Sequence, residues 1–234
     1  MNSNKLTAKI TGVLFILGFA GILTAAFTRS ILGDPDYLSK ISANENPVIW
    51  AAFFQFIMGS ACAGIGISLY PVLKKYNEGL ALGSAGFRII EGGIYIVGVI
   101  GLFLLLTLSR EFTKADHPDP SYFQIAGTLL LSLRDWVLLT GTLAWCIGAA
   151  IYYSVFYRTK LIPRWLSGWG LVGIALAWAA GMLVMFHLDT SMSTIQGMLN
   201  LPIALQEMTL AIWLIVRGFN PLSIAFATAK VEMN

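Results

Sequence analysis

The sequence predicts an all-α protein, a polytopic transmembrane bundle of six helices. Hydrophobic residues make up 57% of the 234 residues and charged residues only 12%, whereas soluble domains usually carry about 25% charged residues. The apolar residues form six long, continuous runs, without the period-2 alternation that is typical of membrane β-barrel strands. The composition therefore places the chain in a membrane, and the runs make its spans helical.

Each run is long enough to cross the bilayer, because a hydrocarbon core of about 30 Å requires roughly 20 helical residues. We expect one helix in each of the runs 9–29, 47–73, 80–108, 122–157, 164–186 and 201–217. Pro47, Pro163 and Pro202 stand at expected helix starts, and Pro71 and Pro221 at expected ends. No connection leaves room for a soluble domain, so residues 1–234 are expected to form a single integral membrane domain.

The first run is expected to be a retained helix and not a cleaved signal peptide. Lys5 and Lys9 precede its apolar part, and Thr24-Ala25-Ala26 resembles a cleavage site. However, the apolar stretch of about 18 residues exceeds the roughly 7–15 residues that signal peptides use.

Charge is unequally distributed between the two sets of connections. The side of the membrane that holds both termini would carry nine basic residues and two acidic ones. They are Lys5, Lys9, Lys74, Lys75, Arg158, Lys160, Arg164, Arg217 and Lys230, with Glu78 and Glu232. The other side would hold four basic and seven acidic residues: Arg29, Lys40, Arg110 and Lys114, with Asp34, Asp36, Glu45, Glu111, Asp116, Asp119 and Asp189. By the positive-inside rule both termini are cytoplasmic. Interfacial aromatic residues are then expected on the inner side (Tyr152, Tyr153, Tyr157, Trp165 and Trp169) and on the outer side (Trp50 and Tyr122).

Five charged residues remain inside the apolar runs: Arg88, Glu91, Arg134, Asp135 and Glu207. Each costs about 2.5–3.5 kcal/mol to insert at the centre of a transmembrane helix, so we expect them to meet partners within the bundle. These residues are the candidate site for ligand binding or proton relay.

Their spacing predicts which of them can pair. Arg88 and Glu91 are three residues apart and lie on one helix face. Arg134 and Asp135 point about 100° apart, so Arg134 is expected to reach Glu207 across helices. With two cations and three acids, one carboxylate is left over, and burial would let it exchange a proton. Gln206, beside Glu207, is a candidate for orienting a carboxylate or a ligand.

Other patterns indicate no further chemistry. His117, His187, Cys62 and Cys146 do not have metal-ligand spacing, so we expect no metal site, and each Cys is expected to be a buried apolar residue. No phosphate-binding loop or dinucleotide motif occurs, which gives no reason to expect a cofactor. The formal charge of +3 reflects the basic edges of a membrane protein and does not indicate a nucleic-acid partner.

Four segments resemble a family of prokaryotic membrane proteins catalogued as domain of unknown function 4386. They are "FRIIEG" at 87–92, "LIPRWLSGWGLVG" at 161–173, "LPIALQEMTLAIWLIVRGFNP" at 201–221 and "AKITGVLFILGFAGIL" at 8–23. The resemblance implies a six-helix integral membrane protein of the cell membrane. It implies no activity and no catalytic residues.

The residues themselves favour a binding or transport-like protein of the bacterial or archaeal plasma membrane. In this hypothesis, the charged cluster holds a small ionic or amphiphilic ligand or relays protons. Two alternatives stay open: a membrane-embedded enzyme that uses a carboxylate on a lipid or isoprenoid, and a structural or regulatory subunit in which the charges only fix helix packing. Membrane lipids are the one partner that the composition requires.

The charge asymmetry yields a testable topology. A reporter fused to the C-terminus should be cytoplasmic, and a reporter inserted within residues 189–196 should be external, because basic residues are retained on the cytoplasmic side. Paired fusions read by a reporter that is active only outside the cytoplasm check this; an external C-terminus would overturn the orientation.

Overall fold

The computed structural model of the chain describes residues 3–115, 120–190 and 193–232, and every regular element within these ranges is an α-helix. The helices are α1 (Ser3–Gly18), α2 (Ala20–Leu32), α3 (Tyr37–Ala43), α4 (Glu45–Leu73), α5 (Glu78–Lys114), α6 (Pro120–Thr159), α7 (Arg164–Met185), α8 (Thr194–Val216) and α9 (Pro221–Glu232). The predicted all-α class is confirmed. Asp116, His117 and Asp119, expected in the connection before α6, lie outside the described residues.

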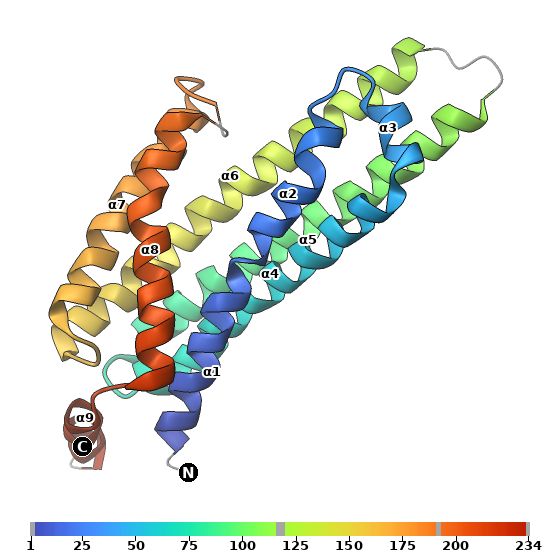
Figure 1. Cartoon of the computed structure of the whole chain (residues 1–234). Helices are drawn as coiled ribbons and strands as arrows, with labels where there is room; N and C mark the ends of the chain where they lie inside the picture. The colour runs from blue at the N-terminus through green and yellow to red at the C-terminus, as the bar shows by residue number, and fades with distance from the viewer. Residues whose placement is uncertain (1–2, 116–119, 191–192, 233–234) are drawn as a thin grey trace.

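Within the described ranges, six helical segments are long and apolar enough to cross a membrane, as predicted. α1 and α2 together make the first, and α4 to α8 make the other five. α5 and α6 contain 37 and 40 residues, more than a perpendicular span requires. Figure 1 shows them running obliquely to α8, so tilt can accommodate their length.

The first span is not the single helix that was expected at 9–29. α1 ends at Gly18 and α2 starts at Ala20, with a turn at Phe19 between them. Gly18 and Gly21 each weaken a helix by about 1 kcal/mol relative to Ala, which makes this the point where the span can bend. Because of the bend, α1 contacts α8, while α2 packs on α4.

The last span starts earlier than the expected boundary at 201. The Ser193 side chain caps α8 by accepting a hydrogen bond from the backbone N–H of Gln196. Pro202 therefore lies inside the helix and not at its start. Before Pro202, Gln196 donates its side-chain amide to the Ala180 carbonyl, and Asn200 donates its side-chain amide to the Gln196 carbonyl.

The helices form a closed ring in the order α1, α4, α5, α6, α7 and α8. Each helix packs on the next, and α8 packs on α1. Close approaches at glycine make this possible: a Cβ at Gly12 would lie 2.7 Å from the Ala211 carbonyl oxygen, and one at Gly173 would lie 2.9 Å from Ile203 Cβ. Both termini lie at one end of the ring, called here the terminal end, and α3 lies at the other, called the α3 end (Figure 1).

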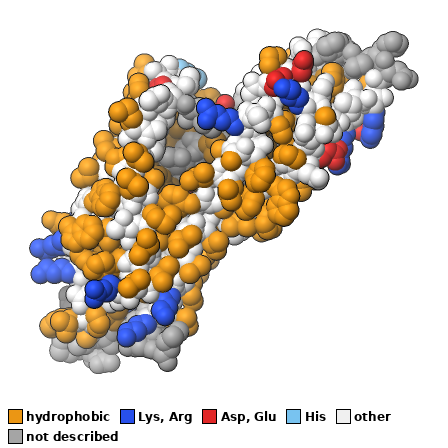
Figure 2. All heavy atoms as spheres, in the orientation of Figure 1, with side chains coloured by type: hydrophobic (Ala, Val, Ile, Leu, Met, Phe, Trp, Pro, Cys, Tyr) orange, Lys and Arg blue, Asp and Glu red, His pale blue; other side chains and the backbone are white. Residues whose placement is uncertain are grey.

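The ring widens toward the α3 end. Figure 1 shows α7 and α8 diverging from α2 and α6 in that direction. Figure 2 shows a hollow between these two groups of helices on the face that it draws. The α3 end is thus the open end of the bundle, while the terminal end is closed by a core that includes Tyr152, Tyr153 and Phe156.

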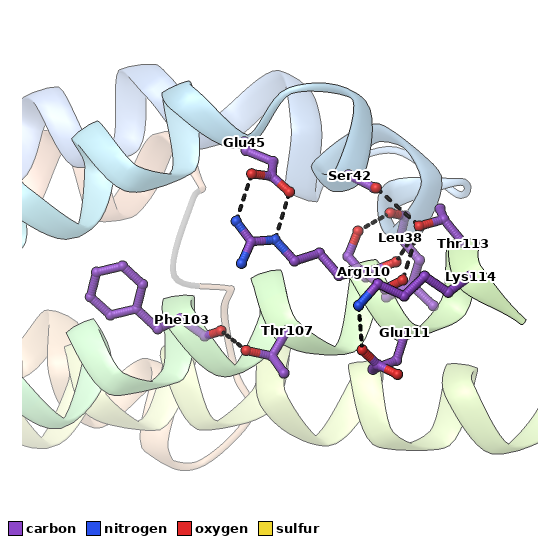
Figure 3. Close-up of polar contacts among 10 residues, drawn as sticks. Leu38, Ser42, Glu45, Phe103, Thr107, Arg110, Glu111, Thr113 and Lys114 are labelled. Carbon is purple, nitrogen blue, oxygen red and sulfur yellow. Dashed lines mark hydrogen bonds and ion pairs between the residues drawn. The ribbon is translucent and has the colours of Figure 1, made fainter.

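Polar contacts fasten α3 and the start of α4 to α5 at the α3 end. Figure 3 shows the Arg110 guanidinium facing the Glu45 carboxylate, with Nε and Nη2 each donating to one oxygen at 2.6 Å. The Ser109 hydroxyl donates to the Leu38 carbonyl, and Ser42 and Thr113 bond to each other at 3.1 Å. In the same connection, a hydrogen bond from Lys40 holds the pKa of Asp34 below its ordinary value.

The outer surface of the spans is apolar, as lipid contact requires. On the face in Figure 2, hydrophobic side chains cover the middle, and the acidic side chains in view lie at the α3 end. Tyr157, Trp165, Trp50 and Tyr122 are exposed at the expected ends. The prediction that Tyr152 and Tyr153 lie at the interface is wrong. Both are fully buried, because their side chains point from α6 into the core of the bundle.

The contact between α4 and α5 depends on Gly92, and its neighbour Gly93 provides a control. A Cβ at Gly92 would lie 2.4 Å from the Gly59 carbonyl oxygen, whereas one at Gly93 would meet nothing within 4 Å. Gly92→Ala should therefore lower the free energy of unfolding by about 1–3 kcal/mol. Gly93→Ala should leave it unchanged or raise it by up to about 1 kcal/mol. Unfolding measured in detergent separates the two, and equal effects would contradict this packing.

Candidate functional site

A cavity of about 180 Å³ lies inside the ring, between α1, α4, α5, α6 and α8. Its lining combines three charged residues with polar and aromatic ones: Phe15, Gly18, Phe19, Met58, Cys62, Ile65, Arg88, Glu91, Tyr95, Thr142, Trp145, Asn200 and Glu207. Three of the six predicted site residues, Arg88, Glu91 and Glu207, thus come together in one place. We refer to this space as the central cavity.

Arg88 and Glu91 form the predicted ion pair along α5. Arg88 Nη1 and Glu91 Oε2 lie 2.9 Å apart, and each residue is only 2% exposed. Arg88 Nε also donates to the Cys62 carbonyl on α4, at 3.3 Å. Gly66 on α4 leaves room for the aliphatic part of the Arg88 side chain, because a Cβ at Gly66 would lie 2.7 Å from Arg88 Cβ.

The pairing leaves part of Glu91 unused. Its Oε2 faces Arg88 at ion-pair distance but accepts no hydrogen bond from the described residues. Cys62 lies beside the same carboxylate. Among the described residues, the charge of Arg88 and not a hydrogen bond therefore holds Glu91 Oε2.

Glu207 enters the central cavity from α8. Its Oε1 accepts hydrogen bonds from Trp145 Nε1 at 3.2 Å and from the Tyr152 hydroxyl at 3.4 Å. No Lys, Arg or His among the described residues lies within 4.0 Å of it. The central cavity thus holds one guanidinium and two carboxyl groups, and Arg88 is close enough to interact electrostatically with both.

The predicted pair between Arg134 and Glu207 is wrong. Arg134 Nη2 donates to the Thr28 hydroxyl of α2 at 2.8 Å, and no carboxylate in the described parts of the chain lies within 4.0 Å of Arg134. Arg134 is 11 residues before Trp145 on α6, or about 16 Å along the helix, while Trp145 is the residue that touches Glu207. Asp135 lies on the exposed side of α6. Of the five charged residues expected in one cluster, only Arg88, Glu91 and Glu207 therefore lie together.

Gln206 does not face the central cavity. Its Oε1 accepts a hydrogen bond from the Tyr153 hydroxyl at 2.5 Å, and its Nε2 donates to the Leu166 carbonyl at 3.0 Å. The side chain is fully buried. Gln206 therefore connects α8 to α6 and α7, and the expectation that it would orient a carboxylate directly is not met.

A second cavity, also of about 180 Å³, adjoins the first on the side of α7. The two share Thr142 and Asn200, and Gln196 lines the second. Gln196 also donates through Nε2 to the Asp189 carboxylate at 3.1 Å. Asp189 accepts two further hydrogen bonds, from Ser193 Oγ at 2.5 Å and from Thr190 N at 2.8 Å. The bond from Ser193 does most to hold the pKa of Asp189 below its ordinary value. Polar side chains thus continue from the central cavity toward the α3 end.

Sequence reasoning missed the residues that hold Glu207. Trp145 and Tyr152 are seven positions apart on α6, so they lie on one face of that helix, and both point at the same carboxylate. Tyr95, Thr142 and Asn200 were also missed. The seven-residue spacing of Trp145 and Tyr152 was the available signal, but Tyr152 was assigned to the membrane interface and Trp145 was not considered.

The fold and the central cavity define a multi-pass helical membrane protein with ionisable groups inside its bundle. The chain belongs to the family described as a domain of unknown function, DUF4386, whose model matches residues 10–218. The matched range runs from α1 to just past the end of α8 and includes every charged residue of the central cavity. No curated protein and no solved structure matches the chain.

The Arg88–Glu91 pair should behave as a unit in stability measurements. Arg88→Met should lower the free energy of unfolding by about 3–5 kcal/mol, because it leaves a buried carboxylate without its cation. Arg88→Met combined with Glu91→Leu should recover most of that loss. The exposed pair Arg110–Glu45 is the control, since breaking it should change stability little. Additive losses from Arg88 and Glu91 would contradict a coupled pair.

Proposed function

We propose that the protein binds a small cation, or a proton, in the central cavity and passes it along the bundle. The observation that carries the proposal is Glu207, a carboxyl group inside the bundle with no cation within ion-pair distance in the described chain. Arg88 supplies fixed positive charge, and Glu91 and Glu207 compete for it. A ligand with one positive charge, or a proton, balances the remaining acid.

The acidic groups of the central cavity outnumber its basic groups. A charged side chain at the bilayer centre costs about 2.5–3.5 kcal/mol on insertion scales. The Arg88–Glu91 pair cancels two of the three charges in the central cavity at a separation of 2.9 Å. Glu207 keeps a formal negative charge unless it takes up a proton or meets a cation. The site therefore favours positive ligands over anionic ones.

The walls and the size of the central cavity favour a small ligand. Trp145, Phe15 and Phe19 line it, and aromatic rings attract cations through their negative faces. Its volume of about 180 Å³ is below the roughly 300–1,000 Å³ of sites for drug-sized molecules. A membrane-embedded enzyme for a lipid or isoprenoid would need more room, so the cavity supports a small ionic or amphiphilic ligand better.

Access is proposed from the α3 end. The second cavity continues from Thr142 and Asn200 in that direction, and the ring is widest there. The positive-inside rule makes the α3 end external in a plasma membrane. Ligand would then enter from outside, and the closed terminal end would have to open for release, as in transporters that alternate access around a central site.

Glu207→Gln tests the proposal. The amide oxygen can still accept hydrogen bonds from Trp145 and Tyr152, so the variant should fold normally. It should lose stabilisation by methylammonium, a small cationic probe, and any proton movement into liposomes that contain a pH-sensitive dye. Thermal unfolding with and without the probe, and dye fluorescence after a pH jump, measure the two effects.

Glu78→Gln is the matched control for that experiment, because it removes one acid at the exposed start of α5. It should behave as the wild type in both assays. If Glu207→Gln strongly destabilises the protein, and no probe effect or proton movement exists to lose, the carboxylate is structural and the proposed function is wrong.

A further inference from the structure

A larger cavity, of about 510 Å³, lies at the terminal end, away from the central cavity. It is formed by the turn between α6 and α7, the last turn of α8 and the start of α9. Its lining includes Lys160, Arg164, Trp213, Arg217, Phe219 and Asn220. We call it the terminal pocket.

Three basic residues line the terminal pocket, and they come from three separate segments. Lys160 ends the α6 region, Arg164 begins α7 and Arg217 follows α8. Among the residues whose side chains the structure describes, no acidic one lines the pocket. Within the described residues, no carboxylate lies within 4.0 Å of any of the three. The pocket therefore presents positive charge that the described part of the protein does not neutralise.

The backbone around the pocket is held in a fixed shape. Lys160 adopts a left-handed conformation with φ of 56°, which costs a non-glycine residue about 1 kcal/mol or more. Its carbonyl oxygen accepts hydrogen bonds from Asn220 Nδ2 at 3.3 Å and Ser223 Oγ at 3.2 Å. Asn220 N donates to the Leu161 carbonyl at 2.9 Å. These bonds from the start of α9 hold the turn that carries Lys160.

The pocket lies where a bilayer meets water. Trp165, exposed beside it, is a residue typical of the membrane interface. α9 runs across the end of the bundle (Figure 1), and its Leu222 and Phe226 are 70% and 78% exposed. An apolar helix face in that position suits insertion among lipid headgroups. Trp213 and Phe219 give the pocket itself apolar walls.

We propose that the terminal pocket binds the headgroup of an anionic phospholipid. The phosphate would interact with Lys160 and Arg217, with Arg164 adding positive charge beside them, and the glycerol and upper acyl chains would pack on Trp213 and Phe219. Basic pockets between transmembrane helices at a membrane surface suit such headgroups, because charge attraction and apolar contact act together. A soluble phosphate compound would use the cations but not the apolar walls or the interfacial position of α9.

Native mass spectrometry of the full chain in a neutral detergent tests the site, with phosphatidylglycerol and phosphatidylcholine as probes. The wild type should retain phosphatidylglycerol in preference to phosphatidylcholine. Lys160→Gln with Arg217→Gln should weaken phosphatidylglycerol binding about 30-fold. Arg164 is left in place because it donates to the Tyr157 carbonyl and stacks on that ring.

Lys74→Gln with Lys75→Gln is the matched control, since it removes two positive charges at the same end, outside the pocket. It should leave the preference for phosphatidylglycerol unchanged. Arg217→Gln alone, which spares the turn that carries Lys160, should weaken binding about fivefold and serves if the double variant does not fold. Equal weakening by the control pair, no preference between the two lipids, or full competition by glycerol 3-phosphate would each overturn the proposal.

Discussion

The structure depends on one constraint: polar and charged groups within the hydrocarbon layer must find their partners inside the bundle. The Arg88–Glu91 pair is where this constraint is strongest, because both residues are nearly inaccessible in the middle of an apolar helix. The pair requires α4 to approach α5 closely, which Gly66 permits. The carbonyl of Cys62 on α4 then accepts a hydrogen bond from Arg88, so the buried arginine of this pair also links α5 to α4.

The central cavity follows from how the ring closes around that pair. α8 reaches α1 at Gly12, which brings Glu207 to the same interior space as Arg88 and Glu91. Two neutral donors, Trp145 and Tyr152, hold Glu207 there in place of a cation. A purely structural role would need only matched charges. An unmatched carboxyl group, fixed by donors that suit it both with and without its proton, is what a site for protons or cations requires.

The hydrophobic runs predict the number of spans and the helical class, because both depend on length and composition alone. The Arg88–Glu91 pair was equally predictable, since i,i+3 spacing brings two side chains together within one helix. The partner of Arg134 was not, because it depends on the relative depth of two helices. α6 carries Arg134 about 16 Å away from the level of Trp145, where Glu207 sits. Tyr152 and Tyr153 were misplaced for a similar reason: a sequence gives their depth along a helix but not which way that helix faces its neighbours.

The proposed role of Glu207 is to bind a cation or a proton that does not come from a basic side chain of the protein. A cryo-electron microscopy map of the protein in native lipid, at a resolution that shows ordered small ligands, tests this most directly. We predict non-protein density in the central cavity. This density should lie within hydrogen-bond distance of Glu207 and beside the intact Arg88–Glu91 pair. A dry, collapsed cavity in which Glu207 pairs with Arg88 or another basic residue would contradict it.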